Sequence, residues 1–199
     1  MSEILLIRHA QTDMAGTFCG SSDPELNARG WIQVRELVER LRSENIGTVY
    51  TSDLRRAFST ASAIAVAHGV ECHVRPLLRE IDFGCWEGLA WKEIEQQDPI
   101  YAHRWMKEYP HLPSPEGESL DCFEARVLKE IRLLWEEAQN MDQSVAVVSH
   151  AGVLRFVLSS FHECTDEEAW EQTRPYCSIV RHTFQRSTTF SKALEGDKL

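Results

Sequence analysis

The chain has 199 residues, of which 43% are hydrophobic and 26% are charged. This composition is ordinary for a globular protein, and the length favours one domain over residues 1–199 rather than two small ones. A net charge of −10 argues against nucleic acid as a partner. Because the sequence has no run of about 18 apolar residues and no signal-peptide pattern at its start, we predict a cytoplasmic protein without a membrane partner.

The spacing of cysteines and histidines indicates neither a disulfide framework nor a metal site. The six cysteines form no Cys-x-x-Cys pair, and the eight histidines form no His-x-x-x-His pattern. We therefore expect reduced cysteines, no metal and no cofactor.

Apolar runs and helical periodicities alternate along the chain. Strands are predicted at 3–7, 47–51, 71–74, 145–148 and 178–184, and helices at 27–45, 119–140 and 151–161. A further helix, capped by Ser52, is expected to run to about residue 67. Residues 91–118 contain four prolines and predict a partly helical excursion, and 185–199 read as a tail. This alternation predicts an α/β fold, a three-layer α/β/α sandwich with a mostly parallel sheet.

Polar side chains follow three of the predicted strands directly. Arg8 and His9 follow the first strand, Arg55 lies one turn into the helix after the second, and His150 follows the fourth. Each motif alone is more often a surface turn or a capping pair. Because the carboxyl ends of parallel strands share one sheet edge, their coincidence predicts an anion site there. Accessory positions at that edge are Ser52, Ala151 and Gly152.

The motifs together resemble the histidine phosphatase superfamily, the phosphoglycerate mutase-like proteins. They fall in the family's order over residues 3 to about 160. The matching segments are Leu6-Ile7-Arg8-His9-Ala10, Phe18-Cys19-Gly20, Asp23-Pro24-Glu25-Leu26-Asn27, Thr51-Ser52-Asp53-Leu54-Arg55-Arg56-Ala57, Leu78-Arg79-Glu80-Ile81-Asp82-Phe83-Gly84, Gly117-Glu118-Ser119 and Val147-Val148-Ser149-His150-Ala151-Gly152-Val153.

The resemblance implies a role for each matched position. His9 would be the nucleophile that becomes phosphohistidine, and Glu80 would be the general acid. Arg8, Arg55 and His150 would bind the phosphoryl oxygens. This chemistry requires no metal, because a neutral imidazole attacks, fixed positive groups stabilise the transferring group and a carboxylic acid protonates the leaving oxygen.

Three departures from the family pattern concern the first loop. Ala10 stands where glycine is usual, and the loop from His9 to Gly20 is short and lacks the usual asparagine. Thr12, Thr17 or the backbone at Gly20 would supply the missing phosphate contact. The departures affect substrate specificity rather than the phosphoryl-transfer core.

Several alternatives remain open from the sequence. Glu87 is a rival acid, although a loop carboxylate that orders a turn is the ordinary interpretation. Trp86, Trp91 and Trp105 fit either a pocket wall or the core. A phosphatase acting on small phosphorylated substrates is favoured over a phosphoglycerate mutase, because 80–150 is compact and the tail is short. A catalytically inactive relative that binds another protein is less favoured, and both a monomer and a homodimer are compatible with the sequence.

Overall fold

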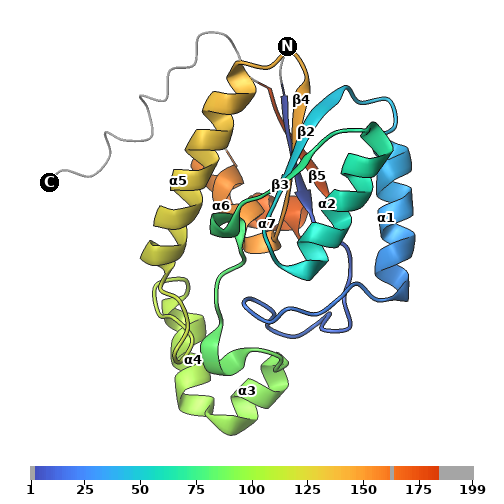
Figure 1. Cartoon of the computed structure of the whole chain (residues 1–199). Helices are drawn as coiled ribbons and strands as arrows, with labels where there is room; N and C mark the ends of the chain where they lie inside the picture. Colours follow the sequence, from blue (N-terminus) through green and yellow to red (C-terminus); the bar gives the residue numbers. More distant parts are fainter. Residues whose placement is uncertain (1–2, 162–163, 184–199) are drawn as a thin grey trace, which may run out of the picture.

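A five-stranded sheet forms the middle layer, with its strands in the order β3-β2-β4-β1-β5 (Figure 1). The computed structural model describes residues 3–161 and 164–183. Strand β1 pairs in parallel with β4, β4 with β2 and β2 with β3, whereas β5 is antiparallel to β1. The strands are β1 Glu3–Arg8, β2 Ile46–Thr51, β3 Cys72–Val74, β4 Ser144–Ser149 and β5 Ile179–Thr183.

Helices cover both faces of this sheet. Side chains alternate along β1, so that Ile4 and Leu6 face one helix layer while Leu5 and Ile7 face the other. The first layer contains α5 (Leu120–Gln139), α6 (Ala151–Phe161) and α7 (Asp166–Thr173), and the second contains α1 (Ala28–Leu41) and α2 (Arg55–His68). The predicted three-layer α/β/α sandwich with a mostly parallel sheet is confirmed.

The segment between β3 and α5 extends beyond the end of the sheet (Figure 1). It contains α3 (Trp91–Gln97) and α4 (Pro99–Glu108), and Asp98 caps α4 by accepting from the Tyr101 N–H at 2.9 Å. Two short 3-10 turns, Pro76–Leu78 and Gly84–Trp86, precede these helices. In the described ranges no helix has the length and apolar character needed to cross a bilayer.

The prediction that Ser52 caps the following helix is wrong. Helix α2 begins at Arg55 with Leu54 as its N-cap residue, and the Asp23 carboxylate accepts from the Arg55 N–H at 2.6 Å. The Ser52 hydroxyl is buried and lies 2.7 Å from His150 Nε2 instead. Asp53 lies before the helix and pairs with Arg79.

Helix α7 was not predicted, because few of its residues are apolar and buried. Only Ala169 and Thr173 of its eight residues are buried. It forms because Thr165 and Glu168 make a reciprocal capping box at its start. The predicted strand at 178–184 is found as β5, while residue 184 and the predicted tail 185–199 lie outside the described residues.

Adjacent leucines on α5 give a matched test of this packing. Leu134 is fully buried against the sheet and Leu133 is 47% exposed. We expect Leu134→Ala to lower the free energy of unfolding by about 2–5 kcal/mol. Leu133→Ala should change it by less than about 0.5 kcal/mol. Urea titrations followed by circular dichroism measure both values, and equal losses would contradict the burial of Leu134.

Candidate active site

Two histidines lie side by side at the carboxyl edge of the sheet. Arg8 is opposite Ser149 in the parallel register of β1 and β4, so His9 and His150 follow neighbouring strand ends. The His9 N–H donates to the Ser149 carbonyl at 2.9 Å, and the ring centroids of His9 and His150 are 5.1 Å apart. Strand pairing therefore brings together two residues 141 positions apart (150 − 9).

The hydrogen bonding of His9 determines which ring nitrogen is available. Nδ1 lies 2.7 Å from the Ala10 carbonyl oxygen, which only accepts, so Nδ1 carries the proton. Nε2 then holds the lone pair. Burial, followed by the charges of Arg56 and Arg8, holds the pKa of His9 well below its ordinary value of 6.5. The ring is therefore neutral at pH 7 and can act as a nucleophile through Nε2.

His150 is buried beside His9 and has one unsatisfied nitrogen. Its Nε2 lies 2.7 Å from Ser52 Oγ, whereas its Nδ1 is buried and has no hydrogen-bond partner among the described residues. Burial and then the charge of Arg56 hold the pKa of His150 well below its ordinary value of 6.5. A buried nitrogen without a partner is costly, and a bound phosphoryl oxygen would satisfy it.

Arg56, and not Arg55, is the arginine that faces the histidines. Arg55 is exposed and its side chain pairs with Glu25, and neither it nor Arg56 lines the cavity described below. Arg56 is completely buried, and it is the charge with the largest effect on the pKa of both histidines. The expected convergence of Arg55 on the site is therefore wrong. The two residues are about 100° apart around α2, and the buried stripe of that helix passes through position 56.

Glu87 and Arg56 hold the loop 19–22 from two sides. Arg56 donates to the carbonyls of Ser22 at 2.5 Å, Gly20 at 2.8 Å and Cys19 at 3.3 Å. The Glu87 carboxylate accepts from the N–H groups of the same loop, with distances of 2.9–3.1 Å. The arrangement agrees with the interpretation of Glu87 as a carboxylate that orders a loop, although the loop ordered is 19–22 rather than the turn at Gly88.

Arg8 lies at the other side of His9. Its guanidinium stacks on the Tyr176 ring at 4.2 Å, and its Nη1 donates to the Arg174 carbonyl. Its Nε is buried without a partner in the described ranges. Tyr176, whose ring is 5.7 Å from that of His9, was missed by the sequence analysis. No pattern singles it out, because it is a lone tyrosine in the turn before β5.

Glu80 is fixed by backbone groups on two segments. Its carboxylate accepts from the N–H groups of Ile81 and Gly152, each at 3.0 Å. A Cβ at position 152 would lie 2.3 Å from Glu80 Oε1, so the close approach requires glycine. In this structure the N–H of Gly152, expected to contact phosphate, is therefore used by Glu80. Ala151 beside it lines the cavity.

A partly buried ion pair holds the segment that carries Glu80. Arg126 on α5 donates to the carbonyls of Leu77, Arg79 and Glu80 at 2.7–2.9 Å. The Glu118 carboxylate receives two bonds from the same guanidinium, each of 2.7 Å. The sequence analysis matched Glu118 but missed Arg126, which lies two turns further along the chain at the helical spacing i+8.

The first loop contributes Thr12 and Thr17 to the cavity wall. Thr12 is buried, and its hydroxyl accepts from the Met14 N–H at 3.3 Å. The Thr17 hydroxyl donates to the Met14 carbonyl at 2.8 Å. Gly20 packs so closely that a Cβ would lie 1.9 Å from the Ile81 carbonyl oxygen. The Thr12 and Thr17 hydroxyls thus line the cavity and also stabilise the turn around Met14.

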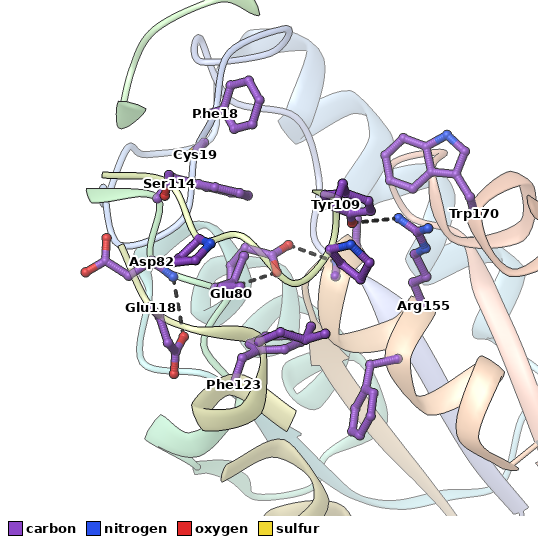
Figure 2. A pocket seen from close by; sticks show the side chains of 18 of the residues that line it. Phe18, Cys19, Glu80, Asp82, Tyr109, Ser114, Glu118, Phe123, Arg155 and Trp170 are labelled. Carbon is purple, nitrogen blue, oxygen red and sulfur yellow. Dashed lines mark hydrogen bonds between the residues drawn. The ribbon is translucent and has the colours of Figure 1, made fainter. Parts of the chain in front are cut away.

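Arg8, His9 and Glu80 line one cavity of about 600 Å³, whereas Arg56 and His150 lie behind its wall and are not among the lining residues. Figure 2 shows Glu80 between Glu118 on one side and Arg155 on the other. Of the three tryptophans considered from the sequence, Trp91 and Trp105 line the cavity while Trp86 is part of a small core beneath them. Within 3–161 and 164–183 no cluster of three His, Cys, Asp or Glu side chains is arranged to hold a metal ion.

Comparisons with known proteins agree with this geometry. Phosphoserine phosphatase 1 of Hydrogenobacter thermophilus is 33% identical over 160 residues, which cover 78% of this chain and 74% of the relative. The alpha-ribazole phosphatase structure from Shigella flexneri has a TM-score of 0.75 at 29% identity, covering 85% of this chain and 84% of the other. The phosphoglycerate mutase structure from Bacillus anthracis shares the fold. Its TM-score is 0.74 at 20% identity, covering 90% of this chain and 86% of the other. The family model of the histidine phosphatase superfamily (branch 1) matches residues 4–195, and the chain belongs to this superfamily.

Proposed function

We propose that the protein is a phosphomonoesterase that hydrolyses small phosphorylated metabolites through a phosphohistidine on His9, without a metal. The observation that carries the proposal is the neutral His9 ring, whose Nε2 is free while Nδ1 is held by the Ala10 carbonyl. The buried Arg56, Arg8 and the unpartnered Nδ1 of His150 supply the groups that stabilise a transferring phosphoryl group.

The reaction would proceed in two displacements. His9 Nε2 attacks phosphorus and forms the P–N bond while the P–O bond to the alcohol breaks, and Glu80 in its acid form protonates the leaving oxygen. Water then attacks phosphorus, Glu80 takes its proton, and the P–N bond breaks to release inorganic phosphate. Glu80 starts the second step as the carboxylate that the first step leaves, held in place by the Ile81 and Gly152 N–H groups.

Hydrolysis is favoured over mutase chemistry by the cavity. The relatives' names do not decide, because two at 29–33% identity are named phosphatases and one from Arabidopsis thaliana at 30% identity is named phosphoglycerate mutase-like protein 4. A mutase must hold an anionic group at both ends of a bisphosphate, whereas of the two arginines that line the cavity, Arg8 and Arg155, the second is paired with Asp166.

The nucleophile can be tested by trapping the intermediate. We expect turnover of p-nitrophenyl phosphate in the presence of EDTA, and acid-labile, alkali-stable label on protein that is denatured while hydrolysing a 32P-labelled ester. His9→Ala should abolish both the label and turnover, because the one hydroxyl seen beside a histidine base, Ser52 Oγ at 2.7 Å from His150 Nε2, is completely buried and does not line the cavity. Acid-stable, alkali-labile label would indicate a serine ester, and a strict requirement for metal would contradict the proposed chemistry.

Arg56 and Arg55 form a matched pair of variants on adjacent positions. Arg56→Lys should lower kcat/KM by about 10²–10³-fold, because it removes a forked donor from the transferring group and from the loop 19–22. Arg55→Lys should leave kcat/KM within about twofold, since that side chain points into solvent. Thermal unfolding of both variants separates catalysis from folding. A larger loss at position 55 would restore the sequence-based assignment.

Glu80 can be tested by the dependence of the rate on the leaving group. Glu80→Gln keeps an acceptor for the Gly152 N–H but provides no acid, so we expect a loss of about 10²–10⁴-fold on an alkyl phosphate. The loss on p-nitrophenyl phosphate should be much smaller, because its phenolate leaves without protonation. An equal loss on both substrates would assign Glu80 a positioning role and return attention to Glu87.

A further inference from the structure

The outer part of the cavity has an aromatic wall. Trp105 packs against Trp91 and Phe18 with ring centroids 5.9 Å apart in each case, and against Tyr109 at 4.9 Å. All four residues line the cavity, together with Trp170 of α7. Faces and edges of aromatic rings in such an arrangement bind flat apolar groups by offset or edge-to-face contacts.

The charges of the lining are distributed unevenly along the cavity. The arginines of the lining are Arg8, at the phosphoryl end, and Arg155 on α6. Arg155 is already neutralised, because its Nε and Nη2 donate to the two oxygens of Asp166 at 3.2 and 2.6 Å. Its Nη1 donates to the Tyr109 hydroxyl at 2.9 Å. Among the described residues, the part of the cavity beside Tyr109 therefore has no guanidinium without a carboxylate partner.

Carboxylates complete this end of the cavity. Glu124 lines it and is half-buried, and no side chain of the described ranges forms an ion pair with it. Burial raises its pKa, as expected for a carboxylate without a cationic partner. Asp82 lines the same wall, where it accepts from Ser21 and from the Gly84 N–H. A second negative charge on the substrate would thus be placed near like charges, with no guanidinium left to bind it.

We propose that the alcohol part of the substrate carries a flat aromatic group and no second negative charge. This inference rests on the proposed phosphatase function and adds the substrate class. It separates this chain from enzymes that act on phosphorylated carboxylic acids: phosphoserine, the compound in the name of one relative, carries a carboxylate that this cavity would disfavour.

A set of esters with one reacting group tests the charge preference. 2-Phenylethyl phosphate, its ring 4-carboxylate and its ring 4-aminomethyl derivative share the same primary alkyl phosphate ester, with the substituent remote from the reacting oxygen. Differences between their kcat/KM values therefore report binding of the ring end. We expect kcat/KM for the unsubstituted ester to exceed that of the carboxylate by about 10-fold or more. The aminomethyl ester should be hydrolysed better than the carboxylate. A carboxylate ester hydrolysed as well as the others would overturn the proposal.

A variant that removes the carboxylate partner of Arg155 provides an internal control for the charge preference. Asp166→Asn should shift the ratio of kcat/KM between the carboxylate and the unsubstituted ester toward the carboxylate by about 10-fold, because the positive charge of Arg155 is then no longer neutralised by a carboxylate. Glu39→Gln makes the same change in net charge on the exposed face of α1 and should leave that ratio unchanged. An unchanged ratio in Asp166→Asn would also overturn the proposal.

The aromatic preference is measured separately. 2-Phenylethyl phosphate should exceed ethyl phosphate in kcat/KM, and Trp105→Leu should reduce this advantage several-fold, whereas Met106→Leu at the next, exposed position should keep it. Equal values for the two esters in the parent protein would overturn the aromatic part. Failure to hydrolyse any ester, p-nitrophenyl phosphate included, would instead contradict the proposed function itself.

Discussion

The site depends on a buried guanidinium whose partners are peptide carbonyls rather than a carboxylate. Arg56 is completely buried, and it donates to three carbonyl oxygens of the loop 19–22. Burial of a charge is costly unless it is well hydrogen-bonded, and here peptide dipoles supply the bonds. The Glu87 carboxylate accepts hydrogen bonds from the N–H groups of the same loop. The loop is therefore oriented between the Arg56 cation and the Glu87 anion. Among the described residues no carboxylate pairs with Arg56, so its positive charge is not neutralised and acts on the neighbouring histidines.

This field explains how a protein with a net charge of −10 can present an anion site. Arg56 and Arg8 lie beside His9 and His150 in a region from which water is largely excluded. Charges act more strongly there than at the solvated surface, where salt screens the many carboxylates. Burial, followed by this field, lowers the pKa of both imidazoles, and His9 requires a neutral ring if it is to attack phosphorus. One arrangement therefore both attracts the phosphoryl group and preserves the lone pair.

The sequence was sufficient for the layers and the sheet edge, because alternation along β1 and β4 and the apolar stripe of α5 are strong local signals. The sequence did not identify the correct arginine, because this depends on the angular position of one residue around helix α2. Arg55 and Arg56 differ by one position, but the spacing of Ala57, Thr60 and Ala61 places the buried stripe on the side of Arg56, and this spacing could have identified it. Tyr176 could not have been found, because only the return of the chain to β5 places it over Arg8.

The distribution of charge along the cavity also restricts how a substrate can lie in it. In the proposed reaction Arg56, Arg8 and the Nδ1 of His150 serve one phosphoryl group, whereas the guanidinium of Arg155 is held by Asp166. A bisphosphate that turns round must find equivalent anion sites in both orientations, and unpaired positive charge at one site favours a single orientation. After the proposed transfer to His9, an uncharged alcohol would have no ionic contact to retain it and would leave before water enters. The pairing of Arg155 with Asp166 therefore links the uneven charge of the cavity to the proposed hydrolysis.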